Sequence, residues 1–162
     1  KNPITFPKNT WWNGQVWKVK TKKTKLEAAD YALVSSTSEG THHYSVGVKR
    51  KASISEIMGN TSPKDLDRFT RALKRLEDGY PEGCCILWLE GSPVELWQAI
   101  PNLPDPKKSG PPWKNFDLFL DLLDSYGISM CWAGTSARSN DLTTRRRVGE
   151  ALLHLMLSKT PH

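Results

Sequence analysis

An unbroken apolar run, Cys84 to Leu89, limits the possible folds of this chain more than any other feature. Six consecutive apolar residues between Gly83 and Glu90 are too few for a core helix and are typical of a strand buried on both faces. Such a strand needs neighbouring strands and helices packed on the sheet. The run therefore predicts a central strand in a layered α/β fold.

The flanking segments predict the other elements of that fold. Alternation and β-branched residues indicate strands at 15–23, 29–35 and 44–51, which fit a three-stranded antiparallel meander, and a further strand at 128–133. Apolar residues at helical spacing indicate helices at 62–77, at 116–127 and at 142–157, the first with Ser62 as N-cap and Pro63 at its first turn. Together these predict a mixed central β-sheet flanked by α-helices.

The length of 162 residues suits one domain with its own hydrophobic core. Five prolines between Ala99 and Trp113 exclude regular structure there and predict an exposed loop at 101–113 within the domain. The segment after this loop is too short to form a separate core. We therefore expect residues 1–162 to fold as a single domain.

Composition narrows the possible functions. The chain has no apolar run long enough to span a bilayer and no signal-peptide core at its start, so we expect an intracellular protein of cytoplasm or nucleus, or a viral or phage protein acting there, with no membrane partner. Cys84, Cys85 and Cys131 are odd in number and are expected to be buried reduced thiols.

The net charge, 23 − 17 = +6, favours nucleic acid as partner. The seven tryptophans can stack on bases, but core packing is the commoner use.

Asp30 and the run Lys49-Arg50-Lys51 are the segments best suited to chemistry. If both lie at neighbouring strand ends, their side chains can converge. A carboxylate is a hard ligand for a divalent ion, and a nearby lysine can orient an attacking water. On spacing alone, however, this pattern is more typical of a solvated strand end.

The order of several motifs resembles the nuclease domain of the XPF/Hef structure-specific endonucleases. In that family a Gly-Asp-Tyr strand is followed by Val-Glu-Arg-Lys, by a helix opening with Ser-Ile-x-Asp-Leu-Ile-Gly, by an Arg-Phe helix and by an apolar strand ending in Glu-Gly. The matching segments here are Ala29-Asp30-Tyr31, Val48-Lys49-Arg50-Lys51, Ser53-Ile54-Ser55-Glu56-Ile57-Met58-Gly59, Arg68-Phe69 and Leu89-Glu90-Gly91. Residues 126–130 and 142–157 are similar to the family's late strand and closing helix, so the resemblance covers nearly the whole chain.

The resemblance implies a restriction-endonuclease-like core and a Mg²⁺- or Mn²⁺-dependent DNA endonuclease of repair or recombination, acting on flaps, forks or other branched duplexes. Asp30 would bind the metal with Glu56, and Lys51 would position the water. Arg50 would support the scissile phosphate. Glu90, and more remotely Glu27, are further candidate metal ligands.

The departures from the family pattern keep a second hypothesis open. Lys49 stands where the family has a metal-ligating Glu, and an amine there disfavours a divalent cation by a few kcal/mol at an effective dielectric of about 20. Glu56 is displaced by one residue and is equally explained as an acid at a helix start. Lys1 to Pro7 resembles the segment just after the family's Asp-x-Arg-Glu strand, which is not in this chain. The alternative is thus an inactive pseudo-nuclease that binds DNA or a protein partner, and a third possibility is an interaction subunit of a homodimer or heterodimer.

The remaining candidates are basic or histidine side chains. DNA contacts are expected from Lys18, Lys20 and Lys22, on one strand face, and from Lys49, Arg50 and Arg68, although lysines of a solvated edge strand explain the first three equally well. Residues 145–147 are three consecutive arginines, and one or two of them are expected to contact phosphate. His42-His43 favour a solvated turn over a metal site, and His154 favours a structural role.

Overall fold

The structure is a computed structural model that describes residues 2–36, 40, 42–99 and 113–160. The predicted loop at 101–113 lies outside these residues except for Trp113, which precedes a helix. In chain order the elements are β1 (Asn9–Trp12), β2 (Gln15–Lys18), β3 (Tyr31–Ser36), β4 (His42–Lys51), α1 (Ile54–Asn60), α2 (Leu66–Gly79), β5 (Cys85–Leu89), α3 (Pro93–Ala99), α4 (Lys114–Ser125), β6 (Ile128–Trp132), the short 3₁₀ helix η1 (Thr135–Arg138) and α5 (Leu142–Lys159).

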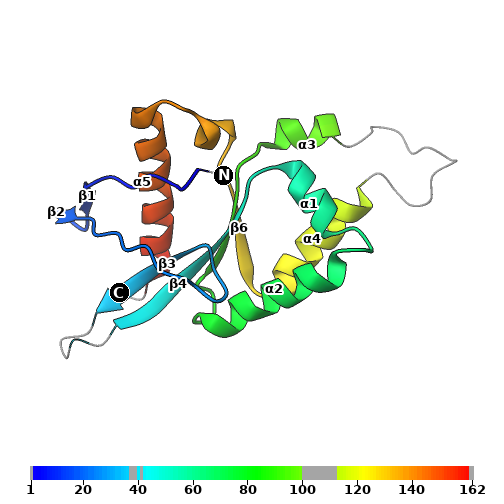
Figure 1. Ribbon diagram of the computed structural model, residues 1–162, viewed down its shortest axis with the longest axis horizontal. Helices are drawn as coiled ribbons and strands as arrows, with labels where there is room; N and C mark the ends of the chain where they lie inside the picture. Colours follow the sequence, from blue (N-terminus) through cyan, green and yellow to red (C-terminus); the bar gives the residue numbers. More distant parts are fainter. Residues whose placement is uncertain (1, 37–39, 41, 100–112, 161–162) are drawn as a thin grey trace, which may run out of the picture.

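A four-stranded mixed sheet forms the centre of the molecule, with strand order β3-β4-β5-β6. β3 and β4 pair antiparallel, whereas β4, β5 and β6 are parallel. All five residues of β5 are buried, as the apolar run predicts. The expected mixed sheet flanked by helices is confirmed, and Figure 1 shows helices on both of its faces.

The sheet separates two hydrophobic layers. On one face Leu87 and Leu89 pack with the apolar stripes of α2 and α4, including Phe69 and Phe119. On the other face α5 covers a second set of buried residues: Val46, Val48, Cys84, Ile86, Trp88, Leu152, Leu153 and Met156. Alternate residues of β5 thus face opposite layers, which explains why its sequence is apolar without interruption.

The predicted antiparallel meander is wrong in its first strand. The strand expected at 15–23 ends at Lys18, and it pairs with β1 in a separate two-stranded hairpin instead of joining β3. The reason is the Asn13-Gly14 turn, in which both residues have positive φ (54° and 81°), as a two-residue hairpin turn requires. Lys20 and Lys22 therefore lie beyond the end of a strand and do not form one face of it.

The start of one predicted helix differs in the structure, and a helix expected only from the family resemblance is present. α2 begins at Leu66 with Asp65 as N-cap, because Ser62 instead hydrogen-bonds backward, its Oγ donating to the Gly59 carbonyl at 2.8 Å. α1, expected only from the family resemblance, is present and is capped by Ser53. The last helix runs from Leu142 as predicted and continues to Lys159.

Residues 2–7 lie against α5 and are held there by polar contacts. The Ile4 backbone N–H donates to the Tyr31 hydroxyl at 2.8 Å, and Arg145 Nη2 donates to the Pro3 carbonyl at 3.1 Å. Gly149 makes the approach possible, because a Cβ at this position would lie 1.9 Å from the Thr5 carbonyl oxygen. The start of the described chain is thereby packed beside the ends of the central strands.

The tryptophans follow the core expectation only in part. Trp88 is buried, and Trp113 and Trp132 are partly buried against the core, whereas Trp11, Trp17 and Trp97 are exposed. Cys84 and Cys85 are buried free thiols as predicted, and Cys131 is partly buried. Among the described residues, no helix combines the length and apolarity needed to cross a membrane.

Candidate functional site

The candidate residues gather where β4 and β5 end. Because these strands are parallel, their carboxyl ends meet at the same edge, with Lys51 beside Leu89. The Glu90 backbone N–H donates to the Lys51 carbonyl at 2.8 Å, so Glu90 directly adjoins the basic run. Asp30 is brought to the same place from the antiparallel side, since its backbone N–H donates to the Val48 carbonyl at 2.8 Å.

Asp30 is held by the basic run itself. Its Oδ2 accepts a hydrogen bond of 2.7 Å from the Arg50 backbone N–H, and its Oδ1 lies 3.8 Å from Lys49 Nζ. The carboxylate side chain is 40% exposed. Lys49, at the position where the family that the sequence resembles has an acidic ligand, therefore lies beside the carboxylate that was expected to bind the metal.

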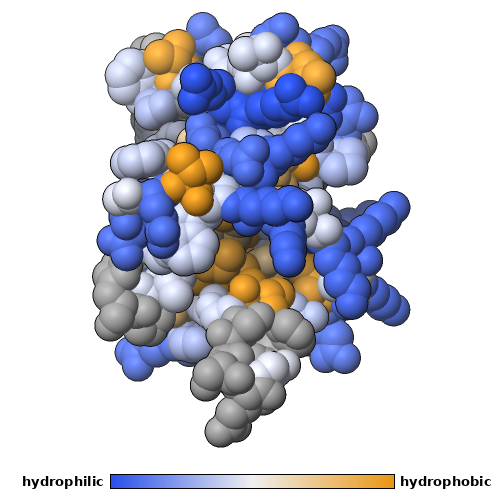
Figure 2. Space-filling model, turned by 90° about the vertical axis from the view of Figure 1, so that its left-hand side faces the viewer, coloured by the Kyte–Doolittle hydropathy of each residue, from blue (hydrophilic) through white to orange (hydrophobic). Residues whose placement is uncertain are grey.

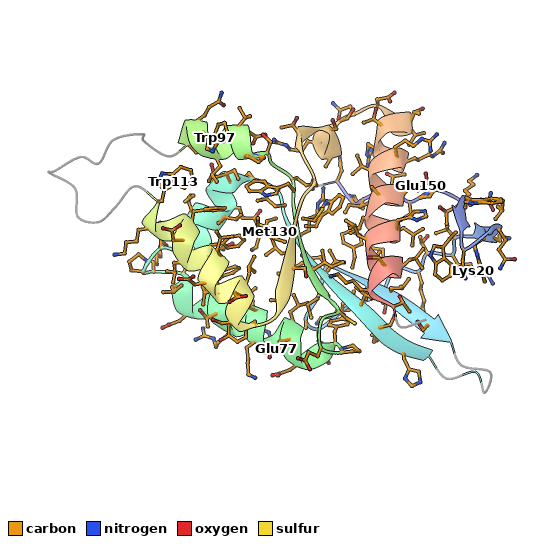
Figure 3. All side chains as sticks on the ribbon, turned by 180° about the vertical axis from the view of Figure 1, so that it is seen from behind. Lys20, Glu77, Trp97, Trp113, Met130 and Glu150 are labelled. Atoms are coloured by element: carbon orange, nitrogen blue, oxygen red, sulfur yellow. The ribbon has the colours of Figure 1, made fainter. Side chains whose placement is uncertain are left out.

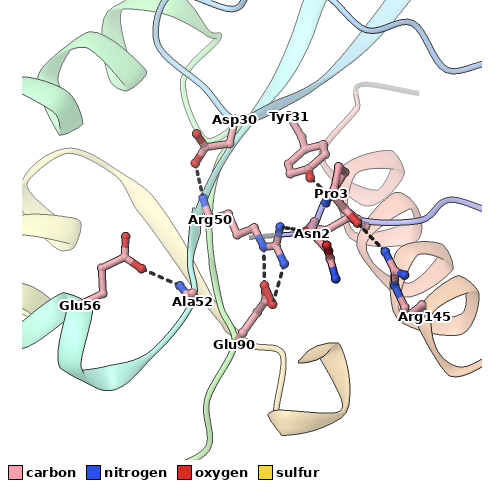
Figure 4. Close-up of polar contacts among 10 residues, drawn as sticks. Asn2, Pro3, Asp30, Tyr31, Arg50, Ala52, Glu56, Glu90 and Arg145 are labelled. Atoms are coloured by element: carbon pink, nitrogen blue, oxygen red, sulfur yellow. Dashed lines mark hydrogen bonds and ion pairs between the residues drawn. The ribbon is translucent and has the colours of Figure 1, made fainter. Parts of the chain in front are cut away.

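Glu90 and Arg50 form a buried ion pair (Figure 4). Glu90 is fully buried, and Arg50 contacts both of its carboxylate oxygens, through Nε and through Nη2, the latter at 3.1 Å from Oε2. Arg50 Nη1 also donates to the Asn2 carbonyl at 2.6 Å. Burial acts to lower the pKa of the guanidinium, but the hydrogen bond and the charge of Glu90 outweigh it and raise that pKa. Both oxygens of Glu90 are thus committed to Arg50.

Glu56 fits the helix-start interpretation. Its backbone N–H donates to Ser53 Oγ at 3.2 Å, and its Oε2 accepts from the Ala52 backbone N–H at 2.8 Å, which closes the first turn of α1. Its Oε1 lies 3.7 Å from Lys51 Nζ. Lys51 is only 6% exposed, and its ammonium lies 5.1 Å from the centre of the Phe69 ring.

The basic run therefore pairs with three acids, each from a different part of the fold: Lys49 with Asp30, Arg50 with Glu90 and Lys51 with Glu56. These are the three carboxylates predicted as metal ligands. Within the described ranges, no three His, Cys, Asp or Glu residues are grouped so that they could hold a metal ion. Because each carboxylate already faces a cation of its own chain, the donor set as arranged does not fit a divalent ion.

A cavity of about 260 Å³ lies next to this network, between residues 2–5, the ends of β4 and β5, and η1 with α5. Arg50, Arg138 and Arg145 line it, and Glu90 is the one acid among its lining residues. Arg138 is oriented by Glu95, whose Oε1 lies 2.9 Å from Nη2. Arginine presents planar donors that match phosphate oxygens, so this lining suits a phosphate group.

The sequence predicted only some of the residues that line this cavity. Arg145 belongs to the triplet that was expected to supply a phosphate contact, but Arg138 was not singled out. The signal that points to it is its place just after a parallel strand, since the residues following such strands share one edge of a sheet.

The other predicted DNA contacts lie elsewhere. Lys18, Lys20 and Lys22 are exposed, and Figure 3 places Lys20 at the opposite end of the molecule from Trp97. Arg68, on α2, is 72% exposed and pairs with Asp65 at 3.2 Å. The structure therefore does not join all six predicted DNA contacts into one patch.

The histidine and arginine candidates have local roles. The solvated turn expected for His42-His43 is wrong, because both residues belong to β4, where His43 is exposed. His154 Nε2 lies 2.9 Å from Thr10 Oγ1, which links α5 to the hairpin. Arg147 pairs with Glu150 at 3.1 Å on the same helix. The structural role expected for His154 agrees with its contact to Thr10.

Comparisons with protein-family models, with curated proteins and with solved structures found no match to this chain.

Proposed function

We propose that this chain is a DNA-binding domain of the XPF/Hef nuclease type that holds the phosphate backbone at the carboxyl edge of its sheet without hydrolysing it. The observation that carries the proposal is the ion pair between Lys49 and Asp30, at the position where a nuclease of this type needs an acid. The order of motifs from Asp30 to Gly91 supports the restriction-endonuclease-like core, and the mixed sheet agrees with it at the level of fold class.

Electrostatics favour binding over metal-dependent hydrolysis at this edge. A divalent ion about 6 Å from an ammonium group is disfavoured by about 5 kcal/mol at an effective dielectric of about 20. The alternative ligand Glu90 is enclosed by Arg50, and releasing it would leave a buried guanidinium without its partner. No step through a metal ion follows from these residues.

The adjoining cavity supplies the binding function. A phosphate seated between Arg138 and Arg145 would be contacted by guanidinium groups from two separate elements, η1 and α5. Arg50 lies at the same wall, and Glu90 fixes its orientation. Contacts of this kind recognise the backbone and not the base sequence, which suits a protein that binds branched or distorted DNA.

Retention of a labelled flap or fork across a salt series tests the proposal. We expect affinity to fall steeply with ionic strength, because bound cations displace counterions from phosphate. Arg145→Gln should lower the slope of log K against log salt by about 1, the value of a single phosphate contact. Arg75→Gln, on the exposed side of α2, serves as the matched control and should not change the slope. Salt-independent association would overturn the proposal in favour of a protein partner.

Incubation of the same DNA with Mg²⁺ or Mn²⁺ tests the absence of cleavage. We expect intact DNA with the parent protein. Cleavage by the parent that is lost in Asp30→Ala would refute the proposal and support the active endonuclease instead.

Lys49→Glu provides the converse experiment. It removes the amine beside Asp30 and adds a carboxylate there, so Mn²⁺ should raise the melting temperature of this variant but not that of the parent. Lys49→Met removes the charge without adding an oxygen ligand, so Mn²⁺ should raise its melting temperature less than that of Lys49→Glu. An equal Mn²⁺ response in all three proteins would show that Lys49 does not decide metal binding.

A further inference from the structure

The β1–β2 hairpin lies on the side of α5 that faces away from the sheet (Figure 1), and the segments that flank it in the sequence are basic. Between residues 8 and 25 the chain carries six lysines and no acid. Figure 2 shows that hydrophilic side chains dominate this face of the molecule. Trp11 is nevertheless 65% exposed on the hairpin, and Trp17 is 42% exposed.

The hairpin backbone is well fixed. The Asn13-Gly14 turn sets its register, and Trp17 Nε1 donates to the Trp12 carbonyl at 2.8 Å. The Trp12 and Trp17 rings also contact each other, with centroids 5.7 Å apart. Thr10 anchors the hairpin to α5, because its Oγ1 donates to Glu150 Oε2 at 2.9 Å and lies 2.9 Å from His154 Nε2.

Trp11 lies on the outer face of this hairpin. Side chains alternate along a strand, so Trp11 points away from buried Thr10, on the same face as its cross-strand partner Val16. Val16 is also 65% exposed, and Lys18 shares this face two residues later. The result is an exposed aromatic ring on a hydrogen-bonded hairpin, with Lys18 on the same face.

We infer that this hairpin face binds single-stranded DNA, with an unpaired base stacked on Trp11 and the backbone held by Lys18 and the lysines after it. A flat aromatic ring is accessible to an unpaired base, whereas the bases of a duplex are already stacked on each other. The excess of lysines over acids complements a polyanion such as DNA. A typical protein surface carries charges of both signs and is complemented less well. The inference rests on the proposed function and extends it, since branched DNA contains single-stranded arms.

Fluorescence anisotropy of two labelled probes tests the inference: an oligothymidylate of about 20 nucleotides and a blunt duplex of about the same length. Trp11→Ala should weaken binding of the single strand by about 5- to 150-fold, the effect of one lost base stack, and should change duplex binding less than about twofold. Trp11→Phe should restore most of the affinity. Trp97→Ala is the matched control, because Trp97 is 61% exposed but lies on α3, away from the hairpin.

The outcomes separate this inference from the proposed function. If Trp11→Ala binds the single strand as well as the parent does, or if it weakens both probes equally, the stacking inference is wrong while backbone binding stands. If the parent binds neither probe, the proposed function itself fails. A circular dichroism spectrum unchanged from that of the parent, together with rescue by Trp11→Phe, excludes loss of the hairpin as the cause.

Discussion

Replacing Arg50 by methionine tests the central ion pair of the site. The substitution keeps an apolar stem of similar length but leaves the carboxylate of Glu90, which is fully buried, without its cation. Removing one partner of a buried pair typically costs about 3–5 kcal/mol. For a chain of this size, that loss corresponds to a melting temperature lower by about 10 °C.

The double variant Arg50→Met/Glu90→Leu separates the pair from its surroundings. Because it removes both charges, we expect it to regain at least about 2 kcal/mol relative to Arg50→Met alone. The hydrogen bond from Arg50 to the Asn2 carbonyl stays lost in both variants, so recovery should be incomplete. Urea unfolding of the parent, Arg50→Met, Glu90→Leu and the double variant under one set of conditions gives the coupling energy.

A second arginine–glutamate pair offers the control. Arg138 and Glu95 are joined at 2.9 Å and 3.2 Å, but their side chains are 43% and 29% exposed. Solvent screens such a pair, so Arg138→Met should cost no more than about 1 kcal/mol. If Arg50→Met costs as little as Arg138→Met, or if the double variant is as unstable as the two single losses added together, burial of the Arg50–Glu90 pair does not set its contribution to stability.

Two further predictions concern the packing of the fold. Gly149→Ala should destabilise the protein by about 1–3 kcal/mol in urea unfolding, because its Cβ would collide with the Thr5 carbonyl. Gly59→Ala, in open space on α1, is the control and should be neutral or stabilising by up to about 1 kcal/mol. Equal effects of the two substitutions would contradict the close approach of Thr5 to Gly149. Burial raises the pKa of the Cys85 thiol to about 11, so the unfolded chain loses the thiol proton at a lower pH than the folded protein does. The free energy of unfolding should therefore fall by about 3 kcal/mol as pH rises from about 8.5 to 11. Cys85→Ala should not show this loss, and identical pH profiles of the parent and the variant would refute the prediction.

The sequence was most informative where one local pattern has one structural solution. The run Cys84 to Leu89 contains no polar residue, and only a strand covered on both faces satisfies it. The stripe of Phe116, Phe119, Leu120 and Leu123 likewise predicts α4, and all of these residues except Leu120, which is exposed, form its buried face. Such local agreement was enough to place the layers and most of the strands.

Prediction failed where two local signals competed or where partners lie far apart in sequence. Ser62-Pro63 looks like a helix start, but Ser62 closes the end of α1 instead. Arg50 meets Glu90 across 40 residues and Asn2 across 48, and no periodic pattern connects such positions. The basic run was recognised, but the pairing of Lys49 with Asp30 and of Arg50 with Glu90 depends on tertiary structure.

The complete burial of β5 has a consequence for folding. Its two neighbours are parallel strands, so it pairs only after the long connections through α1 and α2 and through α3 and α4 have closed. Until then the chain exposes the segment Cys85 to Leu89, which has no charge and no proline. We expect refolding at high protein concentration to compete with aggregation through this strand, so dilute refolding should give the higher yield of native protein.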